Sequence, residues 1–443
     1  MYFLYNLLLA AGLPFLAAYW IFQALFRGKV RRGLRDRLGF PDLSAAPGDA
    51  PTVWLHAVSV GEVHAAAPFV QALKRKLPGW RFVLSTVTET GREAGVRRIP
   101  EADARIYFPL DLPGPVAAAV RRVKPRLVVI LETEIWPNFL WRLFAEGIPT
   151  VIVNGRVSPR SFRRYLRVRP LMARALAKVT GFGAQSEADA RRVTRLGAPP
   201  ERVRVMGNLK FDGAAESEPP GPEEKTAIRK ALGLSGDAPV WVAGSVHPRE
   251  EAPVVDAYRS LLKTHPSLQL VLAPRHPNRA RAIADLLRGR KVPHLLREGG
   301  SAEESARAPV LVLNTMGDLV SAYRAGDVSF VGGSLFPWGG QNPLEPAGLG
   351  IPVLFGEHMQ NFEEAARALM ETPPGGESAA LQIGGSLDGA ASRLAEAVGR
   401  VLDSPETARA MGERGRRVVR AQAGAAERYA DWVAEISAGR TRA

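Results

Sequence analysis

The 443-residue sequence contains no cysteine, which excludes disulfides and thiolate metal sites and makes a reducing compartment such as the cytoplasm the default expectation. The sequence also lacks a Walker A motif and the Asp-X-Asp pair that metal-dependent sugar-nucleotide enzymes use. Gly181-Phe182-Gly183 lacks the third glycine of a dinucleotide fingerprint, and we interpret it as close packing at a strand. We therefore expect neither a metal ion nor a bound cofactor.

Acidic residues are in deficit: 44 Asp and Glu oppose 59 Lys and Arg, which leaves a net charge of +15. Such a charge predicts an anionic partner, which can be nucleic acid, an acidic membrane surface or a phosphorylated substrate. Aromatic residues are sparse in the basic regions, which argues against a surface for single-stranded nucleic acid. With 46% apolar residues the chain has ample material for burial, and its length favours two domains.

Charged residues are absent from the first 26 positions. As a helix, Met1 to Phe26 would be about 39 Å long, which is enough to span a bilayer, so we expect residues 1–26 to be a membrane anchor. Six basic residues follow between Arg27 and Arg37, and a basic flank of this kind stays on the cytoplasmic side. We expect the main body of the protein to be cytoplasmic.

Two alternatives to a spanning anchor deserve comparison. A cleaved signal peptide needs a basic start, a shorter apolar run and a small-residue cleavage site, and none of these is convincing here. Because Pro14 interrupts the run, the helix can also lie in the membrane interface instead of crossing it.

Short apolar runs alternate with helical stretches after the anchor, a pattern typical of a parallel sheet with helices on both faces. The expected strands of the first half are Thr52 to Ala57, Arg81 to Val87, Arg126 to Leu131 and Thr150 to Val153. A proline-rich and acidic segment, 213–224, follows and is typical of a linker. The alternation then restarts, with strands expected at Pro239 to Ala243, Leu268 to Ala273, Pro309 to Leu313, Val328 to Val331 and Pro352 to Phe355.

This organisation predicts an α/β protein of the GT-B type, in which two Rossmann-like domains face each other across a cleft that holds the site. We place the anchor at 1–26, an N-terminal Rossmann-like domain at 27–212, the linker at 213–224, a C-terminal Rossmann-like domain at 225–390, and C-terminal helices at 391–443.

The segment from His56 to Glu62 (His-Ala-Val-Ser-Val-Gly-Glu) ends a predicted strand, turns at a glycine and opens a helix with a carboxylate. Ligands bind at this edge of open α/β sheets, and glycosyl transfer needs a base that takes the proton of the attacking hydroxyl. Glu62 is therefore a candidate base. An equally good interpretation is that Glu62 only complements the helix dipole. The dipole would lower its pKa, so a base at this position needs burial or a nearby anion to compensate.

Two further residues are candidates for the same site. Glu132 also lies between a strand and a helix, where it can raise the proton affinity of Glu62 or stabilise positive charge at a sugar's anomeric carbon. Its alternative role is that of an ordinary helix N-terminal charge. Lys210 precedes the linker and can offset anionic charge in a cleft, although an ordinary exposed lysine is the simpler interpretation of its position.

A long basic segment lies between Ile148 and Gln185, which contains eight basic residues and no acidic one. Arginine binds phosphate oxygens in a fork, so this segment can hold a phosphorylated lipid headgroup. A solvated helix face explains the charge run equally well.

Strand-end loops of the second half carry residues suited to a nucleotide phosphate, because backbone NH groups and guanidinium share its negative charge. One loop ends at His247, and the next is Pro274-Arg275-His276-Pro277; histidines in such loops are more often structural. A glycine turn and helix start between Gly332 and Val353 can grip a phosphate through backbone amides, and Glu345 can accept hydrogen bonds from ribose hydroxyls. The segment Thr315-Met316-Gly317-Asp318 opens another helix nearby and can contact the base or the phosphate of the nucleotide.

The motifs, taken in their order along the chain, resemble those of the lipid A Kdo (3-deoxy-D-manno-octulosonic acid) transferase family, whose members are inverting GT-B enzymes. The resemblance covers nearly the whole chain. Its most specific parts are His-Ala-Val-Ser-Val-Gly-Glu, Leu-Glu-Thr-Glu-Ile-Trp-Pro-Asn, Gly-Asn-Leu-Lys-Phe-Asp, Pro-Arg-His-Pro and Asn-Pro-Leu-Glu-Pro. One departure is Gln341, where the family often has histidine.

The resemblance implies transfer of Kdo from CMP-Kdo to the lipid A precursor (lipid IVA) in lipopolysaccharide biosynthesis. It implies Glu62 as proton acceptor, with Glu132 and Lys210 as transition-state stabilisers. It implies CMP-binding residues Arg275, His276, Met316, Gly317, Asp318, Asn342, Pro343, Leu344 and Glu345. The implied partners are CMP-Kdo, the lipid A precursor and the membrane surface, without nucleic acid, and the implied location is the inner membrane with the catalytic domains on its cytoplasmic side.

Two other functions compete with this one. Another membrane-associated GT-B enzyme would use a UDP-sugar and a polyprenyl-linked acceptor. A non-enzymatic protein would bind anionic lipid or nucleic acid through its basic face, with strong salt dependence and no turnover.

Overall fold

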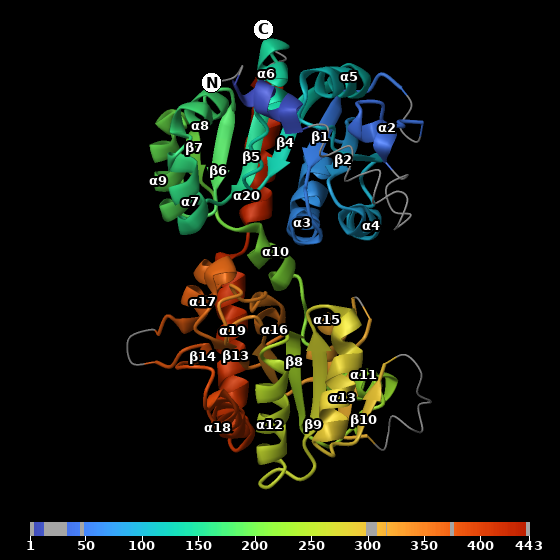
Figure 1. Ribbon diagram of the computed structural model, residues 1–443, viewed down its shortest axis with the longest axis vertical. Helices are drawn as coiled ribbons and strands as arrows, with labels where there is room; N and C mark the ends of the chain where they lie inside the picture. The colour runs from blue at the N-terminus through green and yellow to red at the C-terminus, as the bar shows by residue number, and fades with distance from the viewer. Residues whose placement is uncertain are drawn as a thin grey trace. The chain divides into compact units, whose positions relative to one another are not determined.

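The computed structural model describes residues 4–12, 33–44, 48–297, 308–315, 317–372 and 376–439. The chain forms two compact units, Met1–Gly213 with Gln422–Ala443, and Ala214–Ala421 (Figure 1). The prediction of two parallel-sheet α/β domains is confirmed, because each unit contains one parallel sheet covered by helices.

The sheet of the first unit has the strand order β3-β2-β1-β4-β5-β6-β7, and every neighbouring pair is parallel. All four strands that the sequence predicted in this half are present. The strands are β1 (Thr52–His56), β2 (Arg81–Thr86), β3 (Ala104–Tyr107), β4 (Pro125–Leu131), β5 (Thr150–Gly155), β6 (Gly181–Ala184) and β7 (Val203–Val205).

Helices cover both faces of this sheet because strand side chains alternate between two cores. Val53 and Leu55 of β1 lie in one core, whereas Trp54 lies in the other. The helices of this unit are α2 (Leu34–Arg37), α3 (Val60–Lys76), α4 (Glu89–Arg98), α5 (Pro113–Val123), α6 (Pro137–Ala145), α7 (Pro159–Leu166), α8 (Arg169–Leu176), α9 (Glu187–Leu196), the 3-10 turn η1 (Pro200–Arg202), α10 (Leu209–Ala215) and α20 (Ala425–Gly439).

The last helix, α20, returns to the first unit and packs against α3 (Figure 1). The rings of Trp432 and Tyr429 lie directly over Gly181 and Gly183, where an added Cβ would come within 2.4 and 2.3 Å of those rings. Gly181-Phe182-Gly183 is therefore a packing motif, as the sequence predicted. The predicted C-terminal stretch, 391–443, contains three helices, of which α18 (Ala390–Leu402) and nearly all of α19 (Pro405–Gln422) belong to the second unit and α20 to the first.

The sheet of the second unit has the strand order β10-β11-β9-β8-β12-β13-β14 and is also parallel throughout. Its strands are β8 (Val240–Val246), β9 (Gln269–Pro274), β10 (His294–Leu296), β11 (Val310–Val312), β12 (Val328–Val331), β13 (Val353–Gly356) and β14 (Ala380–Ile383). Its remaining helices and 3-10 turns are α11 (Pro222–Ala231), α12 (Glu251–Leu261), η2 (Pro277–Arg279), α13 (Ala280–Gly289), α15 (Leu319–Ala325), α16 (Leu344–Gly348), η3 (Gln360–Phe362) and α17 (Glu363–Met370).

The predicted linker, 213–224, is shorter than the sequence indicated. Helix α10 extends to Ala215 and α11 begins at Pro222, because Pro222 occupies a first-turn position where its missing NH group is tolerated. The boundary between the two units falls at Gly213.

Of the predicted membrane anchor, 1–26, only residues 4–12 belong to the described part of the chain, and they are helical. Tyr5 Oη donates a hydrogen bond to Asp111 Oδ2 at 2.8 Å, and Asn138 Nδ2 donates one to Asn6 Oδ1 at 2.8 Å. These bonds fix the segment to the first unit. Within the described ranges, no helix combines the length and apolar character needed to cross a membrane.

Candidate active site

The strand order reverses between β1 and β4: β2 and β3 lie on one side of β1, whereas β4 pairs with the other side of β1 and β5 to β7 continue from it. The chain turns from β1 into α3 and from β4 toward α6 at the same carboxyl edge. Such a switch point leaves a crevice in which open α/β sheets bind their ligands. Glu62, in the first turn of α3, and Glu132, directly after β4, both lie at this point.

Glu62 is held in place by the turn that precedes its helix. Val58 N donates to its Oε2 at 2.8 Å, and Ser59 Oγ donates to its Oε1 at 3.0 Å. Ser59 is the N-cap residue of α3, so Glu62 occupies the third helical position, where glutamate commonly reaches back to the cap. The side chain is oriented and nearly buried, with 8% of the residue exposed.

The Glu62 carboxyl has its pKa raised from 4.5 to about 8. Burial is the largest cause, followed by the negative charges of Glu132 and, more weakly, Glu134; the hydrogen bonds from Val58 and Ser59 act in the opposite direction. A base at the start of a helix needed burial or a nearby anion to offset the helix dipole, and the structure provides both.

Lys210 and Glu132 form an ion pair, with Lys210 Nζ 3.3 Å from Glu132 Oε1. Glu132 has a φ of 56°, in the left-handed region that a non-glycine residue adopts at some energetic cost, while its backbone NH donates to Val153 O at 2.9 Å. The strained turn aims the first residue after β4 toward Lys210. The three predicted catalytic side chains are therefore brought together within the first unit.

Asn154 positions the segment that carries Lys210, and sequence reasoning missed it. This fully buried residue has a φ of 56°, and its Oδ1 accepts the backbone NH of Leu209 at 3.0 Å. Asn208 Oδ1 in turn accepts the NH of Lys210 at 3.1 Å. The available signal was an Asn-Gly pair at the end of a predicted strand, since asparagine tolerates the left-handed conformation.

Glu134 is a second carboxyl that the sequence did not single out. Burial, followed by the charge of Glu132, raises its pKa to about 7, and it contributes to the raised pKa of Glu62. Glu134 also lies near Tyr165 of α7, whose pKa is raised first by burial and then by the Glu134 charge. The site therefore gathers three carboxyls and one ammonium, with α7 along one side.

His56, at the end of β1, has a structural role. Its fully buried ring stacks on Phe108 with centroids 4.0 Å apart, and its Nδ1 lies 2.9 Å from Ser85 Oγ. Burial lowers its pKa to about 3, so the ring is neutral at physiological pH and is unsuited to hold charge in the site.

In the second unit, the predicted donor residues also meet at a carboxyl edge. Arg275 and His276 follow β9, and their positive charges add to burial in lowering the pKa of His247, which follows β8. The His247 and His276 rings lie 6.5 Å apart, and Gln341 Nε2 lies 3.3 Å from His247 Nε2. Arg275 and His276 are exposed, which leaves them accessible to an anion.

The Asn342–Glu345 segment begins next to this cluster. Asn342 Oδ1 accepts the NH of Leu344 at 3.1 Å, and its Nδ2 donates to Glu345 Oε1 at 3.1 Å, so Asn342 orders the start of α16 together with Pro343. Helix α16 packs against α15, at whose start Asp318 accepts a hydrogen bond from Thr315 Oγ1. Gly317 is exposed just before Asp318, whereas the predicted CMP contact Met316 lies outside the described residues.

The sequence predicted that backbone amides of the run from Gly332 to Val353 can grip a phosphate. The first amides of this run do not serve that purpose, because Gly333 N, Ser334 N and Leu335 N already donate to the carboxylate of Glu250, at 2.6, 2.9 and 2.9 Å. His247 N is a fourth donor, at 3.0 Å. Glu250 is fully buried, so an internal carboxylate occupies this backbone nest and ties the β8 and β12 loops together.

Comparisons with known proteins agree with the resemblance that the sequence motifs indicate. A family model described as 3-deoxy-D-manno-octulosonic-acid transferase (kdotransferase) matches residues 32–213. The 3-deoxy-D-manno-octulosonic acid transferase of Haemophilus influenzae is 33% identical over 433 residues, 97% of each chain, and that of Bordetella pertussis is 35% identical over 396 residues, 87% of each chain. A glycosyltransferase structure from Rickettsia africae superimposes on 88% of this chain and 99% of its own with a TM-score of 0.59 and 13% identity, which is a likeness of fold alone.

Proposed function

Because the chain belongs to the 3-deoxy-D-manno-octulosonic acid (Kdo) transferase family and is a glycosyltransferase, we propose that it transfers Kdo from CMP-Kdo to a hydroxyl of the lipid A precursor, with Glu62 as general base. The observation that carries this proposal is the group of Glu62, Glu132 and Lys210 at the switch point of the first unit.

The chemistry requires a proton acceptor for the attacking hydroxyl. Glu62 in its ionised form takes the hydroxyl proton while the oxygen forms a bond to the anomeric carbon of Kdo, on the face opposite the phosphate. The bond from that carbon to the phosphate oxygen breaks, its electron pair leaves with CMP, and the configuration inverts. A carboxylate with a pKa of about 8 is a stronger base than an ordinary glutamate, which favours this proton transfer.

The other charges of the site act on the developing charges of the transition state. Positive charge grows at the anomeric carbon as the bond to CMP breaks, and Glu132 supplies a compensating negative charge. Lys210 supplies positive charge that offsets the anionic groups of the substrate. Its ammonium lies 3.3 Å from Glu132 and so also reduces the electrostatic repulsion among the carboxyl groups.

We assign CMP-Kdo to the second unit. Arg275 and His276 place an exposed guanidinium and an exposed imidazole at the end of β9, next to the ordered start of α16 at Asn342. A phosphate recognised there relies on side chains more than on the glycine turn, whose amides already bind Glu250.

We also propose that the first unit lies against the cytoplasmic side of the inner membrane, where it receives its lipid acceptor. Apolar side chains are exposed on the 4–12 helix and on α6, which Asn6 and Asn138 tie together: Leu4, Leu7, Leu8, Trp141 and Phe144. Lys178 lies above the rings of Trp141 and Phe144, 4.2 and 4.5 Å from their centroids. Aromatic rings beside a lysine are typical of membrane-interface surfaces.

Mass spectrometry of lipid products tests the reaction. Purified enzyme in detergent is incubated with tetraacylated lipid A precursor and either CMP-Kdo or a UDP-sugar. We expect addition of one or more Kdo masses from CMP-Kdo only, and CMP but not UDP should inhibit. Transfer from the UDP-sugar would replace the proposed donor, and salt-sensitive lipid binding without turnover by either donor would favour a non-enzymatic protein.

A further inference from the structure

An open cavity of about 410 Å³ lies between α7 and α9 in the first unit. Its wall carries four arginines, one from α7 and three from α9, and its apolar side includes Pro159 and Phe162. The arginines are Arg163, Arg191, Arg192 and Arg195. Known small-molecule sites begin at about 300 Å³, so the cavity has room for a phosphorylated sugar or a lipid headgroup.

The positive charge of this cavity is only partly compensated. Arg192 lies 3.4 Å from Asp189 and donates to Val157 O at 3.0 Å. Arg191 lies 4.0 Å from Glu187 on an exposed surface, where such a pair contributes little. Among the residues that the structure describes, no carboxylate lies within ion-pair distance of the Arg163 or Arg195 side chain.

Arg195 is held in a defined place because its guanidinium lies over the Phe162 ring, 5.2 Å from the ring centroid. Stacking on an apolar ring restricts the guanidinium and leaves its in-plane NH groups free to form a fork with two phosphate oxygens. The ring also excludes water from one side of the cavity, which strengthens attraction to an anion.

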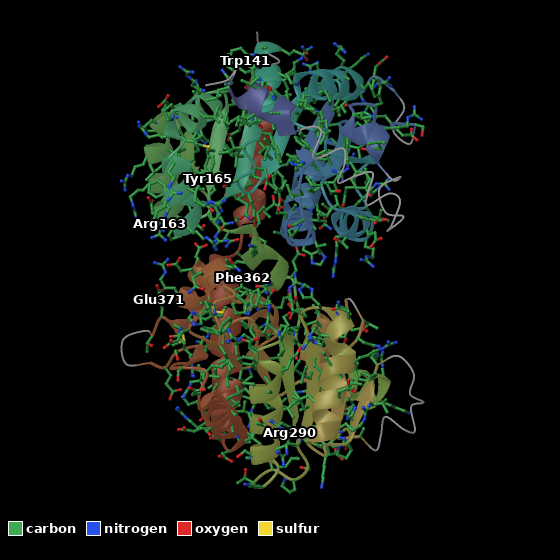
Figure 2. All side chains as sticks on the ribbon, in the orientation of Figure 1. Trp141, Arg163, Tyr165, Arg290, Phe362 and Glu371 are labelled. Carbon is green, nitrogen blue, oxygen red and sulfur yellow. The ribbon has the colours of Figure 1, made fainter. Side chains whose placement is uncertain are left out.

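Two features connect this cavity to a lipid acceptor. Leu166 and Val168, at the end of α7, are 37% and 40% exposed, which places apolar side chains beside the charged ones. Helix α7 also lies near the carboxyl cluster, since the negative charge of Glu134 contributes to the raised pKa of Tyr165. In Figure 2, Tyr165 lies nearer the sheet and Arg163 nearer the outer side of α7. The eight residues of α7 span about 12 Å, so the cavity and the carboxyl cluster border the same short helix.

We propose that the cavity between α7 and α9 binds a phosphate monoester carried by a membrane lipid, and that this phosphate is one of those on the acceptor. The inference rests on the proposed function, because it makes the cavity the distal part of the acceptor site. Dianionic phosphate matches the uncompensated guanidinium pair of Arg163 and Arg195, and the acyl chains of the same molecule match Leu166 and Val168.

Acceptor kinetics with the full-length enzyme test the assignment. The double variant Arg163→Gln/Arg195→Gln is compared with wild type and with Arg97→Gln/Arg121→Gln, which removes two exposed arginines from α4 and α5. We expect the first variant to raise the acceptor KM about 10-fold with a similar kcat, and the control to match wild type. Removal of one acceptor phosphate should reproduce the KM increase in wild type, with no further increase in the variant. Arg163→Lys/Arg195→Lys should recover part of the affinity.

A second arm identifies the source of the phosphate without relying on turnover. Flotation with phosphatidylcholine vesicles, with and without phosphatidic acid, should show equal binding of wild type and Arg163→Gln/Arg195→Gln if the acceptor is the ligand. Loss of phosphatidic acid binding with an unchanged acceptor KM would support the phosphate site and overturn its assignment to the acceptor. An unchanged KM and unchanged vesicle binding in a variant with wild-type Tm would overturn the site itself. Failure of wild type to make product would instead refute the proposed function.

Discussion

Lys210 Nζ and Glu132 Oε1 lie 3.3 Å apart at the carboxyl edge of the first sheet, although 78 positions separate the two residues in the sequence. The pair combines a strained strand-end glutamate with a lysine whose backbone is fixed through Asn154 and Asn208. The negative charge of Glu132 contributes to the raised pKa of Glu62, so the proton affinity of Glu62 depends on a member of this pair.

We expect Lys210→Gln to lower kcat by roughly 10- to 100-fold, because it removes a fixed positive charge from a site where substrate charge is reorganised. It should also move the pH profile upward, since the Glu132 charge next to Glu62 is then uncompensated. Lys210→Arg should keep part of the activity. Pre-steady-state rates over a pH series measure both effects, and an unchanged profile in Lys210→Gln would show that Lys210 does not act on the carboxyl cluster.

The pH dependence of the wild-type enzyme follows from Glu62. Only the ionised form accepts a proton, so kcat/KM should rise with pH and level off above about pH 8, the pKa of this carboxyl. At pH 7 roughly a tenth of the free enzyme is ionised at Glu62. Steady-state kinetics from pH 5 to 10, with the acceptor concentration varied at saturating CMP-Kdo, check this; a profile already flat from pH 5 would contradict the raised pKa.

The same residue gives a prediction for stability. The pKa of Glu62 is higher in the folded state, about 8, than its ordinary value of 4.5, so the folded state binds more protons between these pH values. Ionised Glu62 therefore lowers stability as the pH rises from about 4.5 through 8. We expect Glu62→Gln to raise the free energy of unfolding at pH 9 by up to about 3 kcal/mol, after allowance for its weaker hydrogen bonds, and to change it little at pH 4.5. Urea unfolding at both pH values measures the difference, and equal effects at both would exclude a buried titrating carboxyl.

Glu250 should matter more for the second unit than any residue predicted from the sequence. Glutamine offers one acceptor oxygen to the four backbone donors that the carboxylate now binds, so Glu250→Gln leaves buried NH groups unpaired. We expect a loss of about 2–4 kcal/mol in stability and a higher KM for CMP-Kdo. Asp285→Asn, in an exposed pair with Arg288, is the matched control and should be neutral. Thermal melts measure the loss of stability, and titrations with CMP-Kdo measure the change in KM. A wild-type Tm and KM in Glu250→Gln would show that this carboxylate does not hold the β8 and β12 loops together.

The sequence was sufficient for elements whose signal is local. The place of Glu62 and Glu132 at one edge of the sheet could be predicted because Glu62 lies in the first turn of the helix after β1 and Glu132 directly follows β4, and parallel strands bring such positions to one edge. The Gly181-Phe182-Gly183 motif could be recognised as packing because it lacks a third glycine, but its partners Tyr429 and Trp432 come from a helix some 250 positions away.

Residues whose role depends on distant contacts were missed. Glu250 looks like an ordinary surface glutamate between two strands, and only the approach of the β12 loop buries it. Asn154 acts through Leu209, 55 positions later, and the raised pKa of Glu134 arises from the burial of its carboxyl and the nearby charge of Glu132. Their environments arise from tertiary packing, which no local pattern encodes.

The most direct test of the central claim is the single-turnover rate of Kdo transfer by Glu62→Gln, measured with both substrates saturating and with CMP-Kdo affinity determined by calorimetry on the same preparation. Glutamine keeps the size of the side chain but cannot accept the proton, so we predict a rate lower by about 10²- to 10⁴-fold with unchanged CMP-Kdo affinity. A near-normal rate in this variant would contradict the assignment of Glu62 as the general base.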